Sequence, residues 1–168
     1  MASAELLIDA FGRIRDGVHG VLDGLPADHL SVRLDADANP ICWLVWHLTR
    51  VQDDHVAAVA DLEQRWTADG WAARFGLPLT VDDIGYGHRS DQVASVAATA
   101  GDLLGYFDAV DAQTVAWLGG LGDGDLTRIV DDRWDPPVTL AVRLVSVVAD
   151  DLEHLGQAEY VRGILERR

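Results

Sequence analysis

The chain has no lysine: all 13 of its basic residues are arginine, against 28 acidic residues, for a formal net charge of −15. A surface this negative repels the phosphates of nucleic acids and anionic lipids, so we expect no nucleic-acid partner and no membrane partner. No apolar run approaches the roughly 20 residues that a membrane-spanning helix needs. The first residues show no basic head before an apolar block, so the sequence predicts no signal peptide.

Cysteine is almost absent as well. The one cysteine, Cys42, cannot form a disulfide within the chain, which favours a reducing compartment and therefore a cytoplasmic location. Its neighbours predict a small buried core residue. The five-residue spacing to His47 also argues against a Cys–His nucleophile on a helix. Motifs such as G-x-S-x-G and the phosphate-binding glycine loop do not occur.

Helical periodicity is the main feature that is present. With 168 residues, 49% of them hydrophobic, the chain fits a single domain over residues 1–168. Apolar residues spaced three and four apart, punctuated by glycine and proline, predict four helices. They span residues 3–22, 40–66, 90–118 and 138–165. We therefore predict an all-α four-helix bundle with long connections after helices two and three, a short helix at 71–75, and one strand-like segment at 128–130.

The last predicted helix carries the motif D-D-L-E-H-L-G-Q over residues 150–157. Asp150 and His154 are four residues apart, so their side chains share a helix face, and a carboxylate with an imidazole suits a divalent metal such as zinc, nickel or iron. Such a pair is common by chance. Asp151 lies nearer the apolar stripe of the helix and is an alternative ligand, and periodicity alone does not choose between the two aspartates.

Histidines in the second helix are the other candidates. His47 lies in the apolar run W-L-V-W-H-L-T-R, where a buried imidazole needs a partner, so it is either a ligand or a hydrogen-bonded core histidine. For His55 we favour a core histidine capped by Asp53 or Asp54 over a second ligand. The remaining histidines lie in turn-like polar sequence, and we expect them to face solvent: His19, His29 and His88.

Several motifs together resemble a known superfamily. They are W-x-x-x-H-L-x-R-V-Q-D-D-H from Trp43, G-Y-G-H from Gly85, R-W-D-P-P-V-T-L from Arg133, and H-x-G-Q-A-x-Y-V-R-G from His154. Residues 38–163 resemble the DinB-like superfamily of metal-binding four-helix bundles, and in particular an actinobacterial branch related to mycothiol-dependent maleylpyruvate isomerase.

The resemblance implies a metal site of His47, Asp150 and His154. The middle ligand is a histidine in many members of the superfamily and a glutamate in the isomerase, so the shorter aspartate is a departure that keeps Asp151 open as a substitute. Three protein ligands leave coordination positions open, as in catalytic sites. The resemblance therefore implies an enzyme in which a divalent metal activates a low-molecular-weight thiol such as mycothiol for S-transfer to an electrophilic substrate or for isomerisation.

Three further residues are candidates for substrate binding. Arginine suits a carboxylated substrate, so Arg50 and Arg143 are considered, although each also fits an ion pair. Trp134, in a predicted loop, is expected either to line a ligand cleft or to pin the loop. A homodimer is plausible from the superfamily. The alternatives to an enzyme are a non-catalytic metal-binding or stress-related bundle and a purely structural homodimer.

Overall fold

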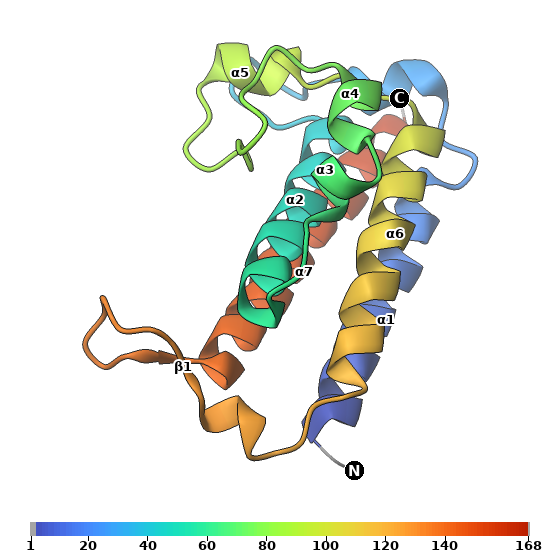
Figure 1. Cartoon of the computed structure of the whole chain (residues 1–168). Helices are drawn as coiled ribbons and strands as arrows, with labels where there is room; N and C mark the ends of the chain where they lie inside the picture. The colour runs from blue at the N-terminus through green and yellow to red at the C-terminus, as the bar shows by residue number, and fades with distance from the viewer. Residues whose placement is uncertain (1–2, 168) are drawn as a thin grey trace.

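The computed structural model describes residues 3–167 and is mainly helical, with one two-stranded hairpin (Figure 1). Four helices are long: α1 (Ser3–Leu22), α2 (Ile41–Ala60), α6 (Ala100–Leu118) and α7 (Leu140–Leu165). The shorter elements are η1 (Ala27–Ser31), α3 (Arg65–Ala68), α4 (Trp71–Phe75), α5 (Ser90–Ser95), η2 (Asp125–Thr127), β1 (Ile129–Asp131) and β2 (Val138–Thr139). The all-α prediction is confirmed.

The long helices form a bundle in which α1 and α2 each pack against both α6 and α7. Figure 1 shows α1 and α7 running in one direction and α2 and α6 in the other. Since α2 and α6 run the same way, the chain between them must return along the bundle. Residues 61–99 make this return and carry α3, α4 and α5, so the long connection predicted after the second helix is present.

Fully buried apolar side chains from all four long helices meet in the centre, for example Phe11, Leu44, Phe107 and Leu144. Burying one such side chain contributes about 1.5–3 kcal/mol, so the interior of the bundle is the main source of stability. Among the described residues, no helix is long and apolar enough to cross a membrane.

Two predicted helices are shorter than their patterns suggested. The second ends at Ala60 rather than at residue 66, because Asp61 adopts a left-handed conformation with φ of 56°. The third is divided: α5 ends at Ser95, and α6 begins only after Thr99, whose side chain accepts a hydrogen bond from the amide of Asp102. A threonine cap of this kind starts a new helix, which apolar spacing alone does not reveal.

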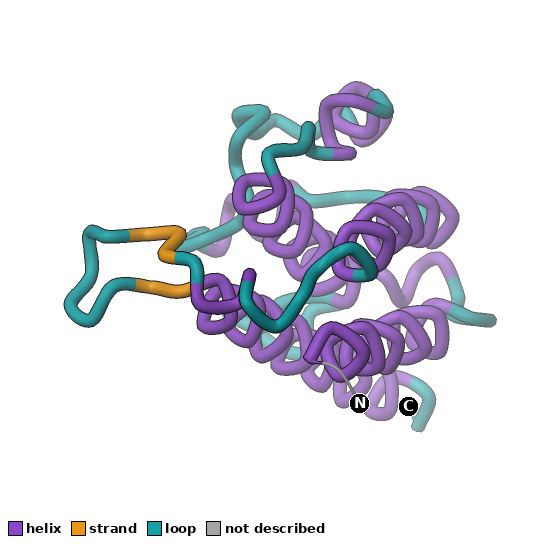
Figure 2. Tube along the Cα trace, turned by 60° about the horizontal axis from the view of Figure 1, so that its bottom comes forward, coloured by secondary structure: helices purple, strands orange, loops and turns teal. Residues whose placement is uncertain are grey.

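A small hairpin precedes α7 and projects from the bundle (Figure 2). The strand-like segment predicted at 128–130 corresponds to β1, which pairs antiparallel with β2. The second strand was missed, since Val138 and Thr139 were assigned to the last helix. Thr139 instead caps α7, accepting from the amide of Val142 at 3.4 Å.

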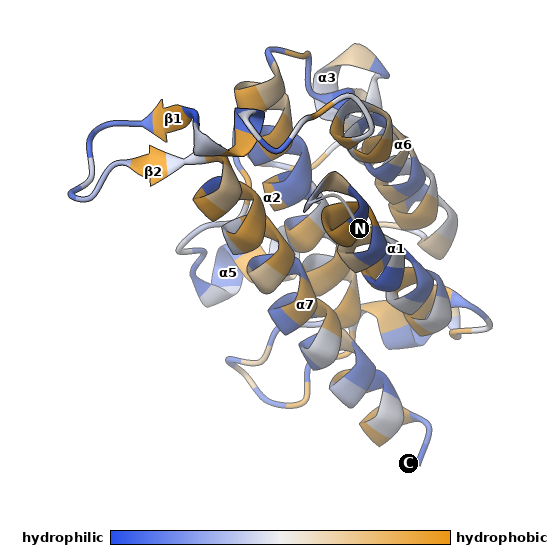
Figure 3. Cartoon of the chain, turned by 90° about the horizontal axis from the view of Figure 1, so that it is seen from below, coloured by the Kyte–Doolittle hydropathy of each residue, from blue (hydrophilic) through white to orange (hydrophobic). Residues whose placement is uncertain are grey.

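Helix α7 is apolar on two faces, which misled the helical-wheel reading of its sequence. Its buried face contains Leu140, Leu144 and Val147, whereas Val145 and Leu152, which are just as apolar, are 59% and 46% exposed. Figure 3 shows how hydrophobic the first turns of this helix are as a whole. An apolar residue on α7 therefore does not by itself indicate the core.

Candidate metal centre

Two helices far apart in sequence bring His47, Asp150 and His154 together. His47 projects from α2, and Asp150 and His154 project from successive turns of α7, which packs beside it. One ligand atom from each side chain lies within 4.8 Å of the other two. The two imidazole rings meet edge to face with centroids 4.6 Å apart. Among the described residues this is the one group of three or more His, Cys, Asp or Glu side chains with such spacing.

Backbone carbonyls fix the orientation of both imidazoles. Nδ1 of His47 lies 2.5 Å from the carbonyl oxygen of Ile84, and Nδ1 of His154 lies 2.8 Å from that of Asp150. Because a carbonyl only accepts hydrogen bonds, each Nδ1 must carry the proton, and each Nε2 then has a free lone pair. Metal-ligating histidines are typically held by this kind of bond.

The pKa values of the three side chains are shifted by burial and by one another. Burial lowers the pKa of His47, which favours the neutral form that binds metals. Burial also raises the pKa of Asp150, but the neighbouring imidazoles, His154 above all, outweigh it and lower that pKa overall. For His154, burial lowers the pKa, yet the nearby Asp150 carboxylate and the hydrogen bond to the Asp150 carbonyl raise it above its ordinary value. A carboxylate thus faces two imidazoles, one of which is protonated more readily than free histidine.

Asp150 has an unused acceptor. Its Oδ2 is buried without a hydrogen-bond partner among the described residues and lies 3.4 Å from His154 Nδ1. Such an orphaned oxygen is costly unless a cation or donor satisfies it. Asp151 lies elsewhere: it is fully buried in the α7 face toward the bundle, outside the three-residue group. Burial raises the pKa of Asp151 well above its ordinary value, which disfavours the charged form that binds cations.

Aromatic groups cover His47. The ring of Trp43 stacks on it at a centroid distance of 4.6 Å, and the Trp43 indole N–H donates to Nδ1 of His88 at 3.1 Å. Nε2 of His88 in turn donates to Asp83 at 2.9 Å. The prediction that His88 faces solvent is wrong, since its side chain is only 3% exposed. The G-Y-G-H motif contained this residue and was the signal for it.

A glycine allows the loop to approach this closely. Gly85 has φ of 93°, which L-residues rarely adopt, and a Cβ there would lie 2.7 Å from Nδ1 of His47. The loop can therefore present the Ile84 carbonyl to His47 only with glycine at the next position. A cavity of about 270 Å³ lies beside these groups, lined by Trp43, His88 and all three residues of the candidate centre.

Arg50 does not fit the substrate-binding role expected for it. It is 0% exposed, and its guanidinium donates to the Asp83 carbonyl, the Gln64 side chain and the Tyr106 hydroxyl. It also lies 3.7 Å from the buried carboxylate of Asp53. Because its guanidinium is fully buried and bonded to residues of the long connection, Arg50 joins that connection to α2 and is out of reach of a substrate.

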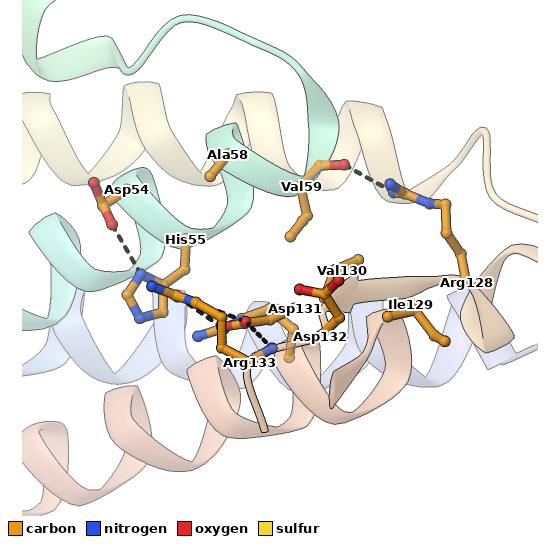
Figure 4. A pocket seen from close by; sticks show the side chains of 11 residues that line it. Asp54, His55, Ala58, Val59, Arg128, Ile129, Val130, Asp131, Asp132 and Arg133 are labelled. Carbon is orange, nitrogen blue, oxygen red and sulfur yellow. Dashed lines mark hydrogen bonds and ion pairs between the residues drawn. The ribbon is translucent and has the colours of Figure 1, made fainter. Parts of the chain in front are cut away.

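The other two substrate-binding candidates lie at the hairpin end of the bundle. The Arg143 side chain is 24% exposed and borders a cavity of about 680 Å³ (Figure 4). Trp134, 65% exposed, lies on the hairpin outside the residues that line this cavity. His55 lines the same cavity and is bonded to Asp54 at 3.0 Å, so it is capped as expected but is partly exposed rather than in the core.

Cys42 is buried, as predicted, and its thiol donates to the Val96 carbonyl at 3.2 Å. Burial raises the pKa of this thiol to about 11. A thiol that stays protonated at neutral pH is a poor nucleophile, so the chain itself offers no reactive sulfur at this position.

Comparison with known proteins gives a family model and a solved structure that resemble the chain. The family model described as mycothiol-S-transferase matches residues 6–167. A solved structure described as the conserved protein of locus from Enterococcus faecalis is 27% identical, covers 100% of this chain and 99% of its own, and superposes with a TM-score of 0.92. No curated protein matches the chain.

Proposed function

Because the chain belongs to the mycothiol S-transferase family, a DinB-like family, we propose that it is a divalent-metal-dependent enzyme that transfers a low-molecular-weight thiol such as mycothiol to an electrophilic substrate. His47, Asp150 and His154 would hold the metal. The observation that carries this proposal is the convergence of their three ligand atoms within 4.8 Å, with both Nδ1 atoms already bonded to carbonyls.

The donor set fits a first-row divalent ion such as zinc, nickel or iron, since it combines two imidazoles with one carboxylate. The orphaned Oδ2 of Asp150 supports the same assignment. Three protein ligands leave room for an exogenous one. When bound, the ion would lower the pKa of a coordinated thiol and so favour the nucleophilic thiolate.

The chain's own residues prepare the rest of the site. Trp43 and His88 shield one side of His47 from water, and the Asp83–His88–Trp43 series of hydrogen bonds fixes the indole ring against the imidazole. Gly85 and Ile84 hold the tautomer of His47. In the transfer, the thiol gives up its proton to solvent, its sulfur forms a bond to the electrophilic carbon, and the bond from that carbon to the leaving group breaks, so that the leaving group departs with the electron pair.

The first experiment is elemental analysis of protein purified without chelator. We expect one divalent ion per chain in the wild type and its loss in both His47→Ala and His154→Ala. His19→Ala is the matched control, because His19 is half-exposed and bonded to Asp108, away from the centre. Full occupancy in either of the first two variants would contradict the site.

The second experiment is a conjugation assay with mycothiol and a model electrophile. We expect turnover only in the metal-loaded wild type and the His19→Ala control. Bound metal without turnover across a panel of electrophiles would instead favour a non-catalytic metal-binding bundle. The two experiments therefore separate the site from the activity.

We also propose that the chain forms a homodimer through the second apolar face of α7. Val142, Val145, Ala149 and Leu152 are exposed there, at spacings of three, four and three residues. This spacing makes a continuous stripe on one side of a helix, the pattern by which two helices pack against each other. A second copy would cover the stripe by presenting the same stripe to it.

A further inference from the structure

A second polar cavity lies along the seam between α2 and α7, at the hairpin end of the bundle. Its volume is about 680 Å³, and its lining comes from α2, from residues 128–133 and from Arg143 of α7 (Figure 4). His55 of α2 is eight residues after His47, and Arg143 is seven residues before Asp150. At 1.5 Å per residue, this cavity therefore lies about 11 Å along the same two helices from the candidate metal centre.

The cavity is lined by equal numbers of carboxylate and guanidinium groups. Its lining has three carboxylates, including Asp131 and Asp132, and three guanidinium groups, including Arg128 and Arg143, together with the His55 imidazole. The formal charges of the carboxylates and guanidiniums cancel. Carboxylates only accept hydrogen bonds and guanidiniums only donate them, so a ligand that satisfies both must itself donate and accept.

Each guanidinium of the lining already has an acceptor within the protein. Asp131 accepts hydrogen bonds from Arg133 at 2.8 and 2.9 Å and from Arg143 at 3.4 Å. These contacts hold the pKa of Asp131 well below its ordinary range, and the hydrogen bonds from Arg133 have the largest effect. Asp131 therefore stays charged. The Arg128 guanidinium donates to the carbonyl of Val59 at 2.8 Å. An anionic ligand would have to compete with Asp131 for the same donors, and a net charge of −15 would repel it as well.

A neutral ligand rich in hydroxyl groups meets neither obstacle. Each hydroxyl donates once and accepts twice, so it can bridge a carboxylate and a guanidinium without displacing either from its partner. Mycothiol has this character at the end away from its sulfur, where it carries two hydroxyl-bearing rings. The distance of about 11 Å between the cavity and the candidate metal centre is of the order of such a molecule's length.

We infer that this cavity binds the neutral, polyhydroxylated end of the thiol co-substrate, while the thiol reaches toward His47, Asp150 and His154. The inference rests on the proposed function for the identity of the thiol. It replaces the expected role of Arg143, which binds sugar-like hydroxyls rather than a substrate carboxylate.

Binding of glucosaminylinositol, acetylated on its amine so that it is neutral as in mycothiol, tests the cavity separately from the activity. The probe has no sulfur, so we expect it to bind the wild type and the metal-free His47→Ala variant with the same Kd in calorimetric titrations. Equal binding in His47→Ala, even with no turnover in any assay, would support the cavity while the transferase proposal failed.

Variants of the lining locate the binding. Arg143→Gln removes a donor and Asp132→Asn weakens an exposed acceptor, and each should weaken glucosaminylinositol about tenfold, as expected for one lost hydrogen bond to a charged group. Arg13→Gln, at an exposed arginine on α1, is the matched control and should bind like the wild type. Circular dichroism confirms the fold of each variant. Unchanged binding in both lining variants, absence of binding to the wild type, or tighter binding of maleate than of glucosaminylinositol in this cavity would overturn the inference.

Discussion

Replacing Gly85 by alanine tests how the loop supports the candidate centre. The change has two costs, because Gly85 has φ of 93° and its new Cβ would lie 2.7 Å from Nδ1 of His47 and 3.0 Å from the Trp46 ring. The backbone cost for an L-residue at positive φ is about 1–2 kcal/mol. The contact forces the loop away and breaks the hydrogen bond from His47 to Ile84, which leaves a buried donor unsatisfied at a further cost of about 1–3 kcal/mol.

Gly87→Ala is the control that separates these costs. Gly87 also has positive φ, at 70°, but a Cβ there meets no atom within 4 Å. We therefore expect Gly85→Ala to lower the free energy of unfolding by about 1–3 kcal/mol more than Gly87→Ala, measured by urea denaturation with unchanged m-values. Metal affinity, where an ion is bound, should fall about 10–100-fold in Gly85→Ala and stay unchanged in Gly87→Ala. Equal losses of stability in the two variants, with equal metal affinity, would refute the proposed support of His47 by this loop.

Three other predictions concern different parts of the chain. Asp53→Asn should lower the free energy of unfolding by about 3–5 kcal/mol in urea denaturation, because the buried carboxylate faces the Arg50 guanidinium and caps α3; a loss as small as that of an exposed aspartate would contradict this. In chelator-treated protein, Asp150 raises the pKa of His154. The wild type should therefore have a higher free energy of unfolding than Asp150→Asn, and this difference should be complete below pH about 6.5 and decline as the pH rises through the raised pKa. A difference that stays constant from pH 5.5 to 8.5 would show that the pair is absent. Leu152→Asp should convert a dimer to a monomer in sedimentation velocity with an unchanged circular dichroism spectrum, since this side chain is exposed on the single chain, and a persistent dimer would exclude this face of α7.

The local features of the sequence were sufficient for the helices and for one pair of the candidate centre. Asp150 and His154 share a face because they are four residues apart, and this holds on any helix. The partnership of His47 with them depends on how α2 packs against α7, which periodicity does not determine; the motif resemblance supplied it. The preference for Asp150 over Asp151 also came from the motif resemblance, because the helical wheel does not show which of the two apolar faces of α7 is buried.

The residues that the sequence misplaced all depend on contacts between distant segments. Arg50 was considered for substrate binding or for an ion pair, yet its hydrogen-bond partners lie 14, 33 and 56 residues away and come together only in the folded chain. His88 was expected in solvent because its neighbours are glycine and polar residues. A loop sequence of this kind gives no indication that Trp43 and Asp83 will bury the imidazole between them.

The attachment of the long connection to α2 has a consequence for how the protein moves. His47, Arg50 and Asp53 lie on successive turns and hold Ile84, Asp83 and the amides of Arg65 and Trp66 respectively. Those two amides should therefore exchange with deuterium as slowly as amides inside α2, although they stand at the start of a helix of only four residues. A connection held in this way should open only when α2 itself opens, so the support of His47 is as stable as the helix that carries it.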